Sequence, residues 1–220
     1  GMCWFNYKYK NKVTYFKGKG VIFSKEDVVV YESNNKRTNI KAKNIVIATG
    51  SAPTSLPGIE IDEKNIVSST GALSFTDVPK DLIVIGGGYI GLEMGSVWSR
   101  LGSNVTVVEY LDFITPGMDR EISNEFKKIL IKQGIHFKLN NKVTAVTNVK
   151  NKVVVDYTNN TTAARERKEC DKVLVSVGRK PYTEGLNLSK IGIKKDNKGR
   201  IEVNEKLQTS LKNIYAIGDV

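Results

Sequence analysis

A glycine-rich stretch between two apolar segments limits the possible folds of this chain more than any other feature. The residues VIGGGYIG place Gly86, Gly88 and Gly91 in a G-x-G-x-x-G pattern directly after the apolar run LIVI. A second apolar run, VTVV, ends at Glu109, which lies 23 positions after Gly86. A strand, a glycine turn, a helix and an acidic residue about 20 positions after the turn are the signature of a dinucleotide-binding βαβ unit.

Each residue of this pattern has a physical task. Gly86 permits the tight turn, Gly88 lets the backbone approach a pyrophosphate, and Gly91 lets the helix pack close to the sheet. The free N–H groups at the start of the helix then face the phosphates. Glu109 can accept hydrogen bonds from an adenosine ribose. A purely structural glycine turn is the alternative, and the complete strand-turn-helix-strand context favours nucleotide binding over it.

Two amphipathic helices are predicted in this region. The first follows the glycine turn, and its apolar face is predicted to contain Ile90, Met94, Val97 and Leu101. The second begins after Asp119 and stops at Gly134, and its predicted face contains Ile122, Phe126, Ile129 and Leu130.

The remaining apolar runs complete an α/β pattern. Residues 142–149 and 152–158 predict a hairpin that turns at KNK, and 171–178 predict a further buried strand. Two more buried strands, in IVIATGS and IYAIGDV, flank this region on both sides. We therefore expect a Rossmann-like domain, with a parallel sheet and an antiparallel β-meander, inserted into a second domain. The predicted boundaries are 1–76, 77–183 and 184–220.

Composition excludes several other classes of protein. The net charge is +11, but the lysines are scattered, mostly beside asparagine, which predicts a solvated surface and no nucleic-acid partner. No apolar run is long enough for a membrane helix, and the first residues do not form a secretory signal. Cys3 and Cys170 lack the spacing of a metal site and are expected to be reduced thiols. The single histidine, His136, is expected on the surface of a strand.

Five motifs in order resemble one known family. KNIVIATGS, IVSSTGAL, VIGGGYIGLEMGSVWSRLGSNVTVVE, VSVGRKP and IYAIGDV are similar to segments of the dihydrolipoyl dehydrogenases, flavoproteins of the pyridine nucleotide-disulfide oxidoreductase family. The resemblance extends from about residue 12 to residue 220 and is greater to the mitochondrial type than to the plastid type. It implies that the inserted domain, 77–183, binds NAD and that 1–76 and 184–220 are parts of an FAD-binding domain.

The resemblance also implies individual site residues. The FAD would contact Gly20, Thr49, Gly50, Ser51 and Asp219, the last at the ribityl chain. The NAD site would be lined by Gly86, Gly87, Gly88, Tyr89, Ile90, Gly91, Leu92, Glu93, Glu109, Val143 and Gly178. From the residues alone, Glu93 is an acid in the first helical turn that complements the helix dipole. The resemblance instead implies that it lies near the nicotinamide and the flavin.

Several family features are missing from these 220 residues. There is no glycine-rich FAD turn before Gly86, no C-x-x-x-x-C redox disulfide and no C-terminal His-Glu pair. We therefore expect the chain to be the middle of a longer protein, without catalytic residues of its own and unable to retain FAD. No metal site is expected. The resemblance implies that the full-length protein is a homodimer in the mitochondrial matrix, and that it oxidises dihydrolipoamide on the lipoyl carrier of a 2-oxo acid dehydrogenase complex.

Two alternatives remain open. One is a related NAD(P)H-dependent disulfide reductase, which an arginine after the second strand would favour. Glu109-Tyr110-Leu111 instead predicts a preference for NADH. The other is a non-enzymatic nucleotide-sensing or basic binding module, against which Glu93 and the two flanking strands argue.

Overall fold

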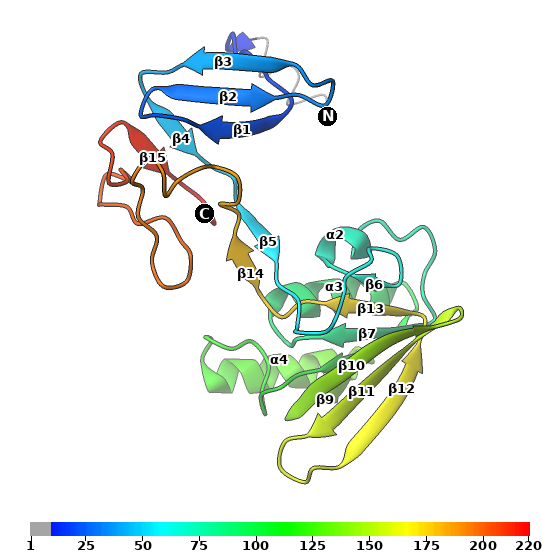
Figure 1. Cartoon of the computed structure of the whole chain (residues 1–220). Helices are drawn as coiled ribbons and strands as arrows, with labels where there is room; N and C mark the ends of the chain where they lie inside the picture. Colours follow the sequence, from blue (N-terminus) through cyan, green and yellow to red (C-terminus); the bar gives the residue numbers. More distant parts are fainter. Residues whose placement is uncertain (1–9) are drawn as a thin grey trace. The chain divides into compact units, whose positions relative to one another are not determined.

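The computed structural model describes residues 10–220, so that Cys3 lies outside the described part. The chain forms two compact units (Figure 1). Pro53–Arg179 form one unit, named here the central unit. Gly1–Ala52 and Lys180–Val220 form the other, named here the split unit because its two segments are far apart in sequence.

A five-stranded parallel sheet forms the centre of the central unit. Its order is β6-β13-β7-β8-β9, and every neighbouring pair is parallel. The strands are β6 (Ile66–Val67), β7 (Asp81–Ile85), β8 (Asn104–Val108), β9 (His136–Lys138) and β13 (Lys172–Val175). The chain leaves β7 toward β8 on one side, and β13 lies on the other side of β7. Such a reversal of strand order is where open α/β sheets bind ligands, beyond the carboxyl ends of the strands.

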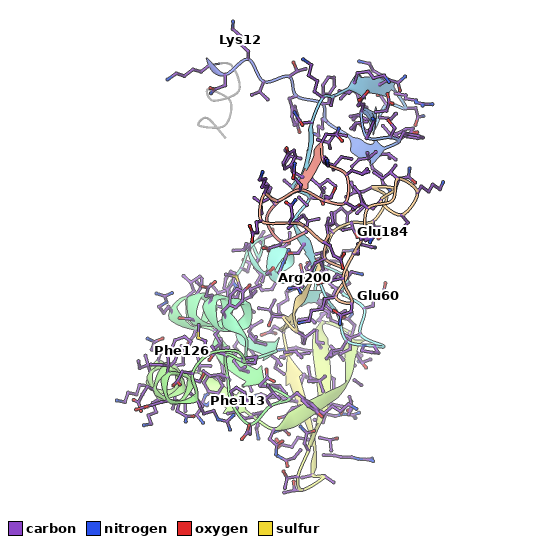
Figure 2. The ribbon with its side chains drawn as sticks, turned by 90° about the vertical axis from the view of Figure 1, so that its left-hand side faces the viewer. Lys12, Glu60, Phe113, Phe126, Glu184 and Arg200 are labelled. Atoms are coloured by element: carbon purple, nitrogen blue, oxygen red, sulfur yellow. The ribbon has the colours of Figure 1, made fainter. Side chains whose placement is uncertain are left out.

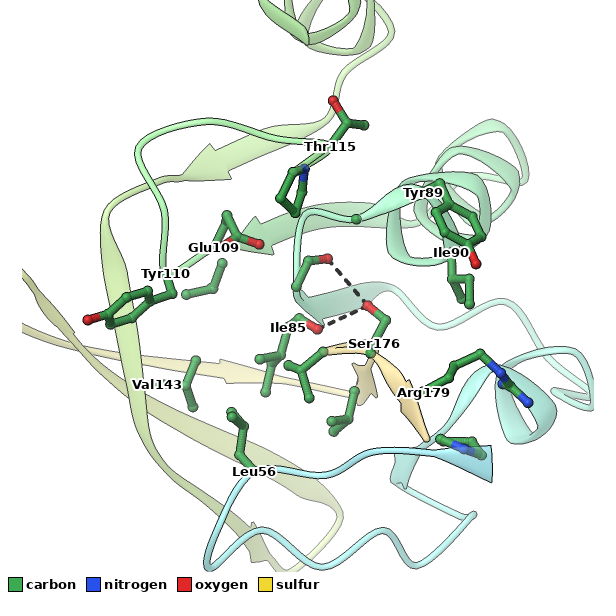
Figure 3. Close-up of a pocket in the computed structure, with 18 of the residues that line it drawn as sticks. Leu56, Ile85, Tyr89, Ile90, Glu109, Tyr110, Thr115, Val143, Ser176 and Arg179 are labelled. Carbon is green, nitrogen blue, oxygen red and sulfur yellow. Dashed lines mark hydrogen bonds between the residues drawn. The ribbon is translucent and has the colours of Figure 1, made fainter. Parts of the chain in front are cut away.

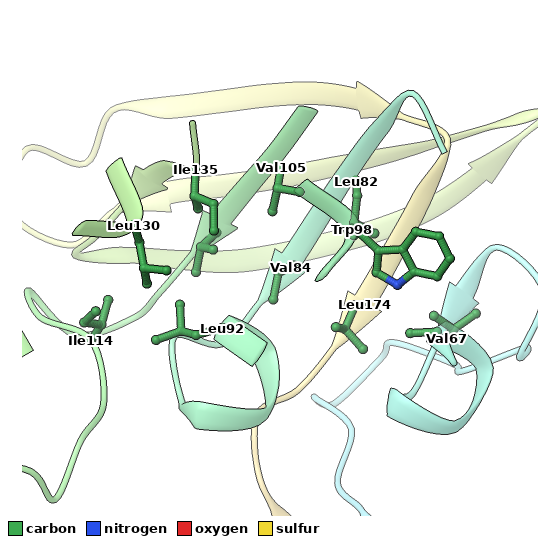
Figure 4. Close-up of a cluster of buried hydrophobic side chains, with 12 residues drawn as sticks. Val67, Leu82, Val84, Leu92, Trp98, Val105, Ile114, Leu130, Ile135 and Leu174 are labelled. Atoms are coloured by element: carbon green, nitrogen blue, oxygen red, sulfur yellow. The ribbon is translucent and has the colours of Figure 1, made fainter. Parts of the chain in front are cut away.

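Both faces of this sheet are buried. Along β7, Leu82 and Val84 point to one face, where they pack with Leu92, Trp98 and Leu130 from the helices (Figure 4). The alternate residues of the strand belong to the core on the opposite face. Burial on both faces explains why these strands are continuous apolar runs rather than alternating ones.

The helices cover one face. They are α2 (Ser69–Ala72), α3 (Tyr89–Arg100) and α4 (Arg120–Lys132), and α3 and α4 lie on the same side of the sheet (Figure 2). Asp119 caps α4 by accepting hydrogen bonds from the N–H groups of Glu121 and Ile122 at 2.9 and 3.2 Å, as its sequence position predicts.

An antiparallel meander covers the other face. It consists of β10 (Asn141–Val149), β11 (Lys152–Asn159) and β12 (Arg165–Cys170). The hairpin between β10 and β11 turns where it was predicted, and the predicted class of fold is confirmed. Cys170 is buried in this layer, and burial raises the pKa of its thiol to about 12, so that the reactive thiolate is disfavoured.

The apolar faces predicted for the two helices are buried only in part, with Met94 and Leu130 at the core. On α3 the buried residues are Gly91, Leu92, Gly95 and Trp98, whereas Val97 and Leu101 are exposed. On α4 only Leu130 of the predicted face is buried, together with Ser123. The sheet contacts the α3 face that carries glycine, because a Cβ atom at Gly95 would already lie 3.3 Å from Val105. Apolar periodicity cannot reveal that choice.

The split unit is built from smaller sheets than the central unit. Strands β1 (Lys19–Ile22), β2 (Asp27–Tyr31) and β3 (Arg37–Lys41) form an antiparallel sheet. Strands β4 (Ile45–Ile47) and β15 (Ile214–Ala216) form a parallel pair. Ile22, Ile47 and Ile214 belong to one shared core. The chain passes from one unit to the other through β5 (Ser51–Pro53) and β14 (Arg179–Pro181), which pair with each other.

The compact units differ from the predicted domain boundaries. Residues 53–76 were assigned to the flanking domain, but they lie in the central unit. The reason is that β6 pairs with β13 at the edge of the parallel sheet, through Val67 opposite Leu174. At the other boundary, Lys180 already belongs to the split unit, three residues before the predicted end at 183.

Candidate nucleotide site

A cavity of about 1290 Å³ opens in the central unit at the carboxyl ends of its parallel strands (Figure 3). Ile85 at the end of β7, Val108 at the end of β8 and Val175 at the end of β13 all line it. The lining is largely apolar, with a few polar and charged groups at the edges of the strands. This is the position that the reversal of strand order predicts for a ligand.

The glycine turn forms one wall of the cavity. Gly86 has φ +104°, and a Cβ atom there would lie 2.5 Å from the carbonyl oxygen of Ser176. A Cβ atom on Gly91 would collide with the carbonyl oxygen of Gly86. By contrast, a Cβ atom on Gly88 would meet no atom within 4 Å. Gly86 and Gly91 are therefore required by the fold, whereas the space beside Gly88 is open to a ligand.

The start of α3 is suited to bind an anion. Gly88 is its N-cap residue and, as a glycine, makes no side-chain capping hydrogen bond to the first N–H groups of the helix. Unpaired N–H groups and the positive end of the helix dipole favour phosphate at such a position. Two cationic side chains, those of Lys142 and Arg179, also line the cavity.

Glu109 lies at the end of β8 and is almost fully buried, with 8% of its surface exposed. One carboxylate oxygen accepts a hydrogen bond from the N–H of Gly87 at 2.6 Å, and the other accepts one from the N–H of Leu111 at 2.8 Å. Each carboxylate oxygen can accept a further bond. Glu109 therefore joins the glycine turn to the end of β8, and it keeps acceptor capacity for a ribose hydroxyl.

Ser176 connects the opposite side of the turn to β13. Its hydroxyl lies 3.0 Å from the carbonyl oxygen of Ile85 and 3.3 Å from that of Gly86 (Figure 3). This contact holds the ends of β7 and β13 together at the cavity.

Seven of the eleven residues proposed for NAD line the cavity. They are Gly86, Gly88, Tyr89, Ile90, Glu109, Val143 and Gly178. Gly87 and Gly91 do not line the cavity: Gly87 lies against Glu109, and Gly91 lies against Gly86. Leu92 lies in the hydrophobic core. Sequence reasoning missed Tyr110, Thr115, Lys142, Ser176 and Arg179 as lining residues. Lys142 and Tyr110 are next in sequence to the predicted residues Val143 and Glu109, and this adjacency could have indicated that they line the cavity.

Glu93 does not line the cavity, and its side chain is exposed. It is the fifth residue of α3, whose first turn contains no acid, so the placement of Glu93 in the first turn is wrong. A carboxylate beyond the first turn interacts little with the helix dipole.

In the split unit, the residues proposed for FAD gather where two parallel strands end. The hydroxyl of Ser51, after β4, lies 3.3 Å from a carboxylate oxygen of Asp219, after β15. Thr49 donates a hydrogen bond to the carbonyl oxygen of Tyr182 at 2.6 Å, and Gly50 adopts φ +68°. Gly20 lies on β1 opposite Val30, and no described contact joins it to this group.

Within residues 10–220, no cluster of three or more His, Cys, Asp or Glu side chains is arranged to hold a metal ion. None of the helices in this described part of the chain has both the length and the apolar character needed to cross a membrane. His136 is exposed on β9.

A model of the pyridine nucleotide-disulphide oxidoreductase family matches residues 5–220. The chain belongs to this family. Its relatives include the mitochondrial dihydrolipoyl dehydrogenase of Pisum sativum, which is 52% identical over 96% of this chain and 42% of its own length. The leghemoglobin reductase of Glycine max is also 52% identical, over 96% of this chain and 40% of its own length. The chain therefore spans less than half the length of these relatives.

Solved structures agree with the sequence relatives. The HOCl-induced flavoprotein disulfide reductase RclA from Escherichia coli superposes with a TM-score of 0.83. It is 28% identical and covers 97% of this chain and 48% of the other. The resemblance to dihydrolipoyl dehydrogenases drawn from the five motifs is confirmed, and the predicted Rossmann-like architecture is confirmed as well.

Proposed function

We propose that the central unit binds NAD, and that the chain is part of a dihydrolipoyl dehydrogenase. Such an enzyme oxidises dihydrolipoamide and passes the electrons through a redox disulfide and FAD to NAD. Family membership supports the use of a pyridine nucleotide and a flavin. The high identity to dihydrolipoyl dehydrogenases supports the choice of substrate.

One observation carries the nucleotide proposal. The glycine turn, the uncapped start of α3 and Glu109 all meet at a single cavity. Its volume of about 1290 Å³ exceeds the roughly 300–1,000 Å³ of ordinary small-molecule sites and leaves room for an extended dinucleotide. The pyrophosphate would lie against Gly88 and the first N–H groups of α3, and the adenosine ribose would lie against Glu109.

The same corner supports NAD over NADP. NADP carries an extra phosphate on the adenosine ribose, close to the carboxylate of Glu109. The first cation after Glu109 in sequence is Arg120, and it is paired with Asp112 at 2.7 Å and stacked over Phe113 at 4.0 Å. That guanidinium is therefore already bound by Asp112 and Phe113, and it does not offset the repulsion between Glu109 and the extra phosphate of NADP.

The FAD proposal rests on the split unit. Ser51, Gly50 and Thr49 would lie against the flavin cofactor and Asp219 against its ribityl chain, with Gly20 as a further FAD contact. Glu93 would lie near the nicotinamide and flavin in the full-length enzyme. The full-length protein would be a homodimer in the mitochondrial matrix that acts on the lipoyl carrier of a 2-oxo acid dehydrogenase complex. The mitochondrial names of several relatives support that location.

Replacement of Gly88 by valine tests the nucleotide site. Gly88 has φ −77°, ψ 173° and open space around its Cβ position, so the fold tolerates the side chain. The valine would occupy ligand space, and we expect NADH affinity in calorimetric titration to fall by about five- to 150-fold. Ala164→Val adds similar bulk at an exposed position between β11 and β12 and should leave the affinity unchanged. Equal affinities of wild type and Gly88→Val would contradict the proposal.

A further inference from the structure

A buried pair of hydroxyl groups joins a residue that lines the nucleotide cavity to helix α4. The Oγ1 atom of Thr115 is 2.7 Å from the Oγ atom of Ser123, and either can donate the hydrogen bond. Thr115 is 4% exposed and Ser123 is 1% exposed. Ser123 belongs to the first turn of α4, so the bond fastens the segment before α4 to that helix.

Thr115 has an unfavourable backbone conformation. Its φ is +51°, in the left-handed region, which β-branched residues rarely adopt. Residues in such conformations persist only where surrounding contacts hold them, and they cluster at ligand sites. Here the side chain is held by Ser123, and the backbone N–H donates to the carbonyl oxygen of Gly87 at 2.8 Å.

The contact with Gly87 connects Thr115 to the glycine turn. Gly87 donates its own N–H to Glu109 at 2.6 Å and accepts the N–H of Thr115 with its carbonyl oxygen. Both ends of this residue are therefore fastened, one by Glu109 and the other by Thr115. Gly87 is the central residue of the Gly86–Gly88 turn, and its neighbour Gly88 would face the pyrophosphate.

Thr115 also begins a turn that lines the cavity. Its carbonyl oxygen accepts a hydrogen bond from the N–H of Met118 at 3.1 Å, and Gly117 has φ +95°. Proline followed by glycine at the two central positions is the signature of a type II turn. Thr115, Pro116, Gly117 and Met118 all line the cavity. One strained residue thus sets the positions of two walls, the glycine turn and this Pro-Gly turn.

We propose that Thr115 and Ser123 are positioning residues of the nucleotide site. Their hydroxyl pair holds the Thr115 backbone in its left-handed conformation. The Thr115 N–H in turn holds Gly87, and through it the position of the adjoining Gly88, which would receive phosphate. The inference rests on the proposed binding of NAD by the central unit. It assigns to α4 a part in nucleotide binding that no motif of the sequence indicates.

Ser123→Ala in the 220-residue chain tests the proposal, with Ser103→Ala as the matched control. Ser103 is also buried, just before β8 begins, and its hydroxyl donates to the carbonyl oxygen of Pro79 at 2.6 Å; neither residue lines the cavity. Both substitutions remove one buried hydroxyl hydrogen bond and should lower the unfolding midpoint similarly. We expect the dissociation constant for NADH to rise by about two- to tenfold in Ser123→Ala and to stay unchanged in Ser103→Ala. Equal affinities of Ser123→Ala and wild type would overturn the proposal.

Substitutions of Thr115 separate the role of the hydroxyl from that of side-chain shape. Thr115→Val keeps the branched shape without the hydroxyl and should weaken NADH binding as Ser123→Ala does. Thr115→Ser keeps the hydroxyl and removes the β-branch, which lowers the steric strain, and this variant should bind NADH as tightly as wild type. Weakened binding in Thr115→Ser equal to that in Thr115→Val would overturn the role of the hydroxyl.

A hydrogen-exchange measurement distinguishes failure of this proposal from failure of the proposed function. If the wild-type chain does not bind NADH, the proposed nucleotide site is wrong. The positioning role is then decided by the exchange rate of the Thr115 amide without ligand. Faster exchange in Ser123→Ala than in Ser103→Ala supports it, and equal rates overturn it.

Discussion

The central and split units bury their strands to different extents. The parallel sheet of the central unit is covered by helices on one face and by the meander on the other, and Ile83 in β7 is fully buried. In the split unit, β4 and β15 are a two-stranded parallel pair, and Val46 is 56% exposed between buried Ile45 and Ile47. Parallel strands are normally covered on both faces. The nucleotide site therefore lies at the end of a sheet that is covered on both faces, whereas the candidate flavin residues lie at the end of a strand pair that is covered only in part.

The largest expected effect is the absence of the full reaction. We predict that this 220-residue chain does not catalyse NADH formation from dihydrolipoamide, even with added FAD. Its only cysteines, Cys3 and Cys170, are far apart in sequence, and Cys170 is buried with a raised pKa. The same preparation should bind NADH, which separates loss of chemistry from loss of folding. Turnover above the uncatalysed rate would contradict this prediction, because it would mean that the split unit works with FAD as the central unit works with NADH.

The flavin test addresses the split unit directly. We predict that the purified chain is colourless, because Asp219 and Ser51 alone cannot anchor a cofactor as large as FAD. An absorption spectrum of the purified protein, before and after incubation with FAD and desalting, checks this. A retained flavin band would mean that the half-covered unit binds its cofactor without further help.

A matched pair of core substitutions tests whether the units are independent. Ile83 in β7 and Ile214 in β15 are both 0% exposed. Replacing either with alanine should destabilise its own unit by about 2–5 kcal/mol, through lost burial and a residual cavity. NADH should raise the unfolding midpoint of the transition that Ile83→Ala lowers, because a ligand stabilises the unit that binds it. It should not raise the transition that Ile214→Ala lowers; calorimetric scans in which NADH shifts both would show coupled units.

Glu109 should set the preference for NADH over NADPH. The extra phosphate of NADPH, of about −1.5 to −2 charge, would lie near the Glu109 carboxylate. At about 4 Å and an effective dielectric near 20, two like charges repel by about 4 kcal/mol. With partial screening we expect about 1–3 kcal/mol, or roughly five- to 150-fold in affinity.

Glu109→Gln keeps the size of the side chain and removes its charge. We expect the NADH-to-NADPH affinity ratio from calorimetry to narrow in this variant. The ratio is the informative quantity, because Glu109 also holds Gly87 and Leu111, so both affinities will fall together. Equal affinities for the two nucleotides in the wild-type chain would refute this role.

The smallest expected effect concerns one ion pair in each unit. In the central unit, the Lys152 ammonium and backbone N–H groups hold the pKa of Asp171 below its ordinary value of 3.8. Its contribution to stability is therefore fully present above that value and is lost as the pH falls through the lower, folded-state pKa. Asp171→Asn should lower the unfolding midpoint at pH 7 by at most about 4 °C.

Asp27, paired with Lys41 in the split unit, provides the comparison. Asp27 is more exposed than Asp171, so Asp27→Asn should have the smaller effect. An effect of Asp27→Asn at pH 7 that equals or exceeds that of Asp171→Asn would contradict this order.

The sequence by itself determined the local features of this protein. The glycine turn, its flanking strands, the Asp119 cap and the β10–β11 hairpin follow from short-range rules of backbone conformation and periodicity. Glu109 was found because the spacing of a βαβ unit is itself local. The five motifs also sufficed to indicate the family.

Only the tertiary structure decided which faces are buried and which distant residues meet. The sheet contacts the glycine-bearing face of α3 rather than the more regular apolar stripe, because the helix backbone lies directly against the side chains of Val84 and Val105 there. Residues 53–76 join the central unit through a pairing between β6 and β13 that spans more than 100 positions of sequence. Ser176 and Thr115 reach the glycine turn in the same way. These choices depend on the packing of segments that are distant in sequence, and a local pattern carries no information about its distant partners.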